Sequence, residues 1–102
     1  MTIGVIATLT VKEGCQADFE ATFADLAQQV LANEEGTLLY ALHRSQSDSC
    51  VYKVLEQYRA QADLVAHGKT DYFKQANVAL NISKYIPWRM FHAGLFNAII
   101  YY

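Results

Sequence analysis

The sequence predicts an α+β domain in which helices cover one face of an antiparallel sheet, and three observations lead to this prediction. The chain has 102 residues, an ordinary size for one domain, so residues 1–102 are expected to fold as a single unit. Apolar residues make up 53% of the chain and charged residues 18%, which excludes general disorder and suggests that an oligomer hides some surface. Segments with strand-like and helix-like spacing of apolar residues alternate along the chain.

The first third of the chain contains a strand and a helix. Residues Thr2–Lys12 place apolar side chains at every second position, which is typical of a strand. The segment from Gln16 to about Asn33 follows helical spacing instead. Its apolar stripe consists of Phe19, Phe23, Leu26, Ala27 and Val30. Gly36 is expected to end this helix as a C′ glycine.

A hairpin and two helices follow. Thr37–Arg44 and Cys50–Tyr58 have strand composition and are separated by a short polar turn, which predicts an antiparallel pair. Ala60–His67 is predicted as a short helix that stops at Gly68. A second helix is expected to start at Thr70 or the next residue, with the threonine as its N-terminal cap.

The last predicted strand, Trp88–Tyr102, is long and almost uncharged. The order strand, helix, strand, strand, helix, strand is that of the ferredoxin-like split βαβ arrangement, with a four-stranded antiparallel sheet. Helices then cover only one sheet face, so the other face needs a partner. We expect an obligate homodimer built on that face and on the final strand, which has a plausible bend at Gly94.

Charge and motifs exclude several classes of function. The net charge is −2 and there is no run of Lys or Arg, so a nucleic-acid partner is not expected. The longest uncharged stretches, 1–11 and 90–102, are too short to span a membrane, and no secretory leader is evident. Cys15 and Cys50 are isolated, as in a reduced cytoplasmic protein, and no metal site is expected. Motifs of serine hydrolases, dinucleotide binding and phosphoryl transfer are absent.

Several segments between Thr2 and Lys74 together resemble the antibiotic biosynthesis monooxygenase (ABM) family, a group within the dimeric α/β barrel superfamily. The segments that carry the resemblance are Val5-Ile6-Ala7, Val11-Lys12-Glu13-Gly14, Phe19…Phe23…Leu26, Asn33-Glu34-Glu35-Gly36-Thr37-Leu38-Leu39-Tyr40, and Leu55-Glu56-Gln57-Tyr58…Ala62…Ala66-His67…Tyr72-Phe73. The resemblance implies a ferredoxin-like homodimer with a cavity between sheet and helices. It also implies oxidation of aromatic phenols or quinols by dioxygen, without metal or flavin.

Some members of the family degrade haem, and the resemblance argues against that activity here. The characteristic Asn, Trp and His of that branch are replaced by Ala7, Ala66 and Asn77. The last 25 or so residues match no pattern of the family. The family therefore suggests a cofactor-free oxygenase. The alternative is a non-catalytic dimeric module that binds a ligand or mediates assembly.

Cofactor-free oxygenation needs a base, hydrogen-bond donors for the developing oxyanion, and a dry aromatic pocket. Histidine suits the role of base, because the imidazole pKa lies near neutral pH. His67 occupies the family's histidine position and is the first candidate. The alternative is structural, with His67 either capping its helix or paired with Glu56. Glu56 is expected in a structural salt bridge, and Glu34 and Glu35 at a solvated helix end.

The remaining candidates are aromatic or polar residues near the same helices and strands. Tyr72 and Asn77 join His67 as candidate catalytic residues, although core packing of the tyrosine and solvation of the asparagine are the alternatives. Trp88, His92 and Tyr40 are candidates for binding an aromatic substrate, although a tryptophan often only fills space.

Overall fold

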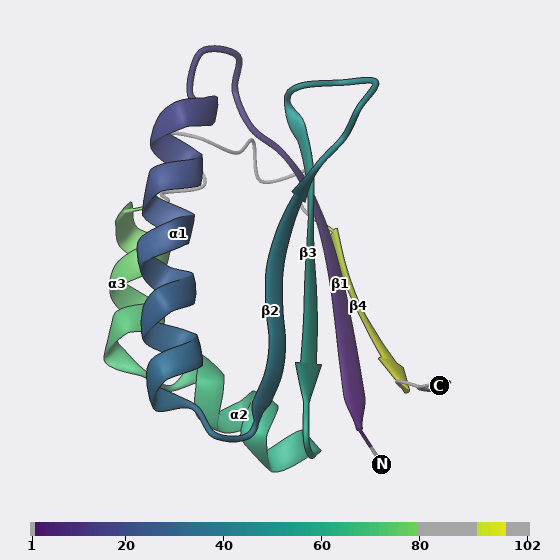
Figure 1. Cartoon of the computed structure of the whole chain (residues 1–102), viewed down its shortest axis with the longest axis vertical. Helices are drawn as coiled ribbons and strands as arrows, with labels where there is room; N and C mark the ends of the chain where they lie inside the picture. Colours follow the sequence, from purple (N-terminus) through teal and green to yellow (C-terminus); the bar gives the residue numbers. More distant parts are fainter. Residues whose placement is uncertain (1, 80–91, 98–102) are drawn as a thin grey trace.

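The computed structural model describes residues 2–79 and 92–97, and its elements follow the predicted order (Figure 1). The elements are β1 (Ile3–Thr10), α1 (Gln16–Asn33), β2 (Thr37–Arg44), β3 (Val51–Tyr58), α2 (Gln61–Gly68), α3 (Asp71–Ala79) and β4 (His92–Asn97). Within the predicted final strand Trp88–Tyr102, the six residues of β4 are confirmed as a strand. The rest of that segment, including Trp88, lies outside the described residues.

The sheet is antiparallel, with strand order β2-β3-β1-β4. The hairpin of β2 and β3 is confirmed, and β1 lies between β3 and β4. Helices α1 and α3 lie side by side over one face of the sheet, and α2 crosses at its lower end (Figure 1). The α+β, ferredoxin-like fold predicted from the sequence is therefore confirmed.

The two faces of the sheet differ in what covers them. On β1, alternate residues Val5, Ala7 and Leu9 are buried beneath the helices. Ile6, on the opposite face of the same strand, is 39% exposed, and Leu39 of β2 is 37% exposed. The side of the sheet that carries Ile6 and Leu39 is called the helix-free face below. None of the described helices covers its apolar residues.

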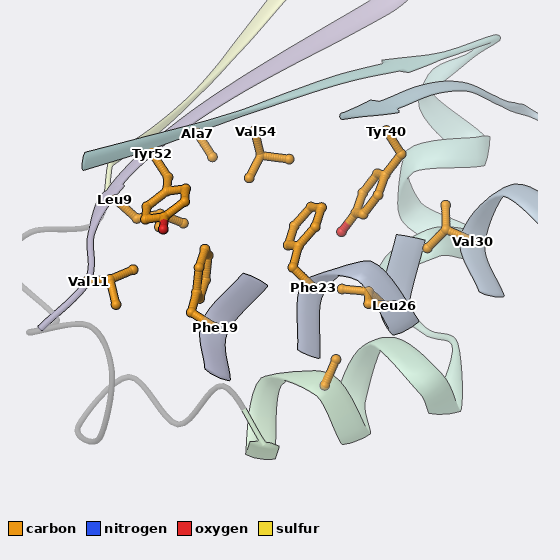
Figure 2. Packing of buried hydrophobic residues seen from close by; sticks show 11 residues of the cluster. Ala7, Leu9, Val11, Phe19, Phe23, Leu26, Val30, Tyr40, Tyr52 and Val54 are labelled. Carbon is orange, nitrogen blue, oxygen red and sulfur yellow. The ribbon is translucent and has the colours of Figure 1, made fainter. Parts of the chain in front are cut away.

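The core forms where α1 packs on the sheet (Figure 2). The predicted stripe of α1 is confirmed, because Phe19, Phe23, Leu26 and Val30 are its buried residues. The Phe19 ring lies 4.8 Å from that of Tyr52, and the Phe23 ring stacks on Tyr40 at 5.4 Å with an interplanar angle of 6°. Tyr40 thus belongs to the core as well as to the region around α2.

Two junctions, one between α2 and α3 and one between α1 and β2, position the side chains of the candidate site. The predicted cap at Thr70 is confirmed, because its hydroxyl donates to the His67 carbonyl at 2.8 Å and accepts the Phe73 N–H at 3.4 Å. Gly36 follows α1 but lacks the left-handed backbone of a C′ glycine, so that prediction was wrong. Close packing is the reason for glycine here: a Cβ on Gly36 would lie 2.0 Å from Oδ1 of Asp63.

Candidate functional site

His67 lies in the last turn of α2 and is almost fully buried, with 3% of its surface exposed. Its Nδ1 atom is 2.9 Å from Oε1 and 3.1 Å from Oε2 of Glu34, the C-cap residue of α1. The structural alternative was that His67 caps its helix or pairs with Glu56. The pairing with Glu56 was wrong, because the carboxylate that His67 contacts is Glu34.

Glu34 is the centre of a hydrogen-bond network. The Thr37 hydroxyl donates to Oε1 at 2.9 Å, and the Tyr72 hydroxyl donates to Oε2. Its side chain is only 12% exposed, so the expected solvated helix end was wrong for this residue and correct for the exposed Glu35. The chain turns at the end of α1 and directs the first of the two carboxylates toward α2.

These contacts assign the tautomer of the imidazole. A carboxylate only accepts hydrogen bonds, so the neutral His67 ring carries its proton on Nδ1 and has a lone pair on Nε2. The Nε2 atom is buried and has no hydrogen-bond partner among the described residues. Buried polar atoms are nearly always paired, so an unpaired acceptor at this place suits a ligand's hydroxyl group.

Aromatic side chains surround the imidazole on several sides. The ring of Phe73 lies 4.5 Å from that of His67, Tyr40 lies at 5.2 Å and Tyr58 at 5.6 Å. They come from α3, β2 and β3, so the site lies between helices and sheet. Burial raises the pKa of Tyr40 and of Tyr58 well above the ordinary value, and both hydroxyls therefore stay protonated at neutral pH.

Glu56 lies on the same side of β3 as Tyr58, whose hydroxyl donates to it at 2.5 Å. The salt bridge expected for Glu56 is not found among the described residues; the tyrosine hydroxyl takes its place. Burial raises the pKa of Glu56, an effect that the Tyr58 hydrogen bond and then His67 oppose. Two carboxylates therefore lie near the imidazole, one bound at Nδ1 and one on the strand side.

A pocket of 430 Å³ lies on the other side of Glu34 and opens to solvent. Its walls come from the α1–β2 connection, the end of β3 and helices α2 and α3, and Glu34, Thr37 and Tyr72 are among its lining residues. His67 is not in its wall. Glu34 thus has one side toward His67 and another toward this pocket.

The structure brings together three of the six candidate residues. His67 and Tyr72 share Glu34, and Tyr40 contacts the imidazole. Asn77 lies in α3, but its side chain is outside the description, as is all of Trp88. His92 lies in β4 and pairs with Thr8 of β1, away from the Glu34–His67 pair.

Sequence reasoning missed Glu34 and Thr37 as members of the site. The only signal was position: Glu34 ends a helix, and a hydroxyl residue follows three positions later. Residues 2–79 and 92–97 contain no group of three or more His, Cys, Asp or Glu side chains placed to hold an ion. In the same part of the chain, no helix has the length and apolar character needed to span a bilayer.

The fold and this buried pair define a small α+β protein with a histidine held between a sheet and its helices. The sequence profile of the antibiotic biosynthesis monooxygenase family matches residues 2–79. The chain belongs to this family, which confirms the resemblance noted in the sequence. None of the proteins of curated function matches the chain.

Solved structures agree with this assignment. A candidate antibiotic biosynthesis monooxygenase from Caulobacter crescentus is 42% identical, with a TM-score of 0.85, over 97% of this chain and 91% of that one. A candidate monooxygenase from Nitrosomonas europaea has a TM-score of 0.87 at 15% identity, covering 96% and 90%. SnoaB of Streptomyces nogalater, a cofactor-independent oxygenase, is 22% identical with a TM-score of 0.79, covering 95% and 92%. The last two likenesses concern the fold alone.

Proposed function

We propose that this protein is a cofactor-independent monooxygenase that oxidises a small aromatic phenol or quinol with dioxygen. The observation that carries the proposal is the Nε2 atom of His67, a buried acceptor without a partner among residues 2–79 and 92–97, surrounded by aromatic rings. Membership of the family supports the class of reaction.

In the proposed reaction, His67 acts as the base. Its Nε2 takes the proton of the substrate's hydroxyl, and the resulting phenolate gives one electron to dioxygen. The radical and superoxide combine at an open ring carbon to form a peroxide. His67 returns its proton to the outer oxygen, the O–O bond breaks, the ring C–H proton is lost, and water leaves. A phenol and O₂ thus give a quinone and one H₂O, with every electron supplied by the substrate.

The surroundings of His67 suit this chemistry in two ways. Glu34 at Nδ1 stabilises the imidazolium that forms when Nε2 takes a proton. The aromatic rings keep water from the base and offer flat surfaces to an aromatic substrate. Trp88 and Asn77 remain expected contacts of the substrate, whereas His92 pairs with Thr8 away from His67 and is not expected to touch it.

We infer that two copies of the chain associate through the helix-free face. Ile6 and Leu39 are exposed there, next to half-buried Ala41 and Leu55 on neighbouring strands. A second copy would cover a face of matching character, because a two-fold axis brings the same surface from each chain together. The high apolar share of the composition supports the same arrangement.

The test of the proposed activity is an oxygen-uptake screen with chelator-treated protein. The panel contains hydroquinones, naphthols and anthrones, and each is measured against its own autoxidation rate. We expect turnover above background for at least one class. A protein that binds panel members but consumes no oxygen with any of them would instead be a non-catalytic binding module.

A further inference from the structure

We propose that Glu34 is the positioning residue that fixes the reactive tautomer of His67, and that the 430 Å³ pocket gives small solutes access to it. The catalytic part of this inference rests on the proposed function. The tautomer itself is a property of the free protein, and it can be measured without a substrate.

The two nitrogens of the His67 imidazole have different surroundings. Nδ1 contacts both oxygens of Glu34, and Nε2 contacts no polar atom among the described residues. In a free imidazole either nitrogen can carry the proton, and the partner at one nitrogen decides the state of the other. Without Glu34 the proton could move to Nε2, and that atom could then no longer accept the proton of a phenol.

Other titratable groups also face His67. They are Tyr40 from β2, Tyr58 and Glu56 from β3, and Tyr72 from α3. The two core tyrosines keep their protons, since burial raises their pKa values, and Tyr58 already donates to Glu56. Tyr72 donates to Glu34 rather than to the ring. None of these four groups forms a hydrogen bond with Nδ1, whereas Glu34 contacts it and can only accept a hydrogen bond.

Glu34 is held by two hydroxyl groups and is accessible from the pocket. The Thr37 and Tyr72 hydroxyls each donate to one of its oxygens, so the carboxylate is fixed in position while it accepts from the imidazole. The same three residues line the solvent-open pocket, from which His67 itself is hidden. Removing the Glu34 side chain would therefore connect the pocket to Nδ1 and leave room for a small carboxylate.

The experiment uses the full chain with Glu34→Gln, Glu34→Ala and, as control, Asp25→Asn, an exposed carboxylate on α1. Two-bond ¹H–¹⁵N correlation at about pH 8 reports which ring nitrogen carries the proton. We expect the Nδ1–H form alone in the wild-type protein and in Asp25→Asn. Glu34→Gln should show a mixture, because an amide can either accept or donate at Nδ1.

Kinetics with a substrate from the oxygen-uptake panel complete the test. We expect kcat of Glu34→Gln to fall about 10- to 100-fold with little change in KM, and Asp25→Asn to match the wild type. Sodium formate, but not sodium chloride at equal ionic strength, should restore both the Nδ1–H form and turnover in Glu34→Ala. If that variant does not fold, Glu34→Gln alone decides.

Two results would overturn the inference. One is a wild-type His67 that carries its proton on Nε2. The other is a folded Glu34→Gln protein whose tautomer and kcat equal those of the wild type. Absence of turnover in every protein, with the tautomers as expected, would count against the proposed oxygenase and leave the positioning role of Glu34 supported.

Discussion

Oε1 of Glu34 lies 2.9 Å from Nδ1 of His67, although 33 residues separate them in the sequence. One residue ends α1 and the other lies in the last turn of α2, so the contact joins the two helices at one end of the sheet. The contact orients the imidazole, because Nδ1 donates to Glu34 and Nε2 is left as an acceptor.

Gly36→Ala should destabilise the protein by about 1–3 kcal/mol, the usual cost of overpacking. The new Cβ would lie 2.0 Å from Oδ1 and 2.8 Å from Cβ of Asp63, so the Asp63 side chain must rotate and its Cβ must give way. Gly68→Ala is the matched control, because a Cβ there meets nothing within 4 Å. Urea denaturation of both variants measures the difference, and equal free energies of unfolding would contradict the packing described here.

Glu56→Gln should raise the melting temperature at about pH 8 and have little effect near about pH 4. Burial raises the pKa of Glu56, so the folded state holds that proton more tightly than the unfolded state does. Stability is then lost as the pH rises from the ordinary carboxyl range through the raised pKa, and an amide removes that loss. Thermal melts across this range check the prediction, with exposed Glu35→Gln as control. An equal gain at both pH values would refute it.

Tyr72→Phe should cost about 1 kcal/mol of stability and also lower turnover, because it removes one donor from Glu34. Burial, and then the hydrogen bond to Glu34, raises the pKa of Tyr72 to about 12, so its hydroxyl is a donor at neutral pH. Tyr52→Phe is the control: it loses a 2.6 Å bond to Glu20 at another part of the core. We expect the two variants to have similar melting temperatures and Tyr72→Phe to have the lower turnover. Equal turnover in the two variants would remove Tyr72 from the site.

The order of elements could be predicted from the sequence because apolar periodicity changes clearly between strands and helices. The buried stripe of α1 and the cap at Thr70 follow from local spacing and chemistry. The role of Gly36 could not be predicted from local spacing. Glycine after a helix usually reflects backbone conformation, whereas here it reflects contact with Asp63, a residue distant in sequence.

The candidate site could be predicted only in part. His67 and Tyr72 were both found through their positions in the family pattern. Glu34 was missed because nothing in Glu34-Glu35 distinguishes the two carboxylates before the chain folds. The direction of a side chain at a helix end depends on the turn that follows, and that turn is set by packing against α2.

Light scattering should give a dimer at micromolar concentration, since the helix-free face leaves Ile6 and Leu39 exposed. Leu39→Lys should weaken the dimer, because it places a charge in the interface that we propose. Leu31→Lys is the control, as Leu31 is 55% exposed on α1, which packs on the opposite face of the sheet. A wild-type protein of 11.5 kDa in solution would contradict this assembly.

The most direct test of the proposed function compares wild-type protein and His67→Ala in ¹⁸O₂ without added metal or cofactor. The substrate is the panel member with the highest turnover, and Tyr52→Phe serves as the variant with a core defect remote from His67. We expect one labelled oxygen in the quinone and one in water, with turnover reduced about 100-fold or more in His67→Ala alone. A folded His67→Ala protein that forms labelled quinone at the wild-type rate would contradict the role of His67 as the base.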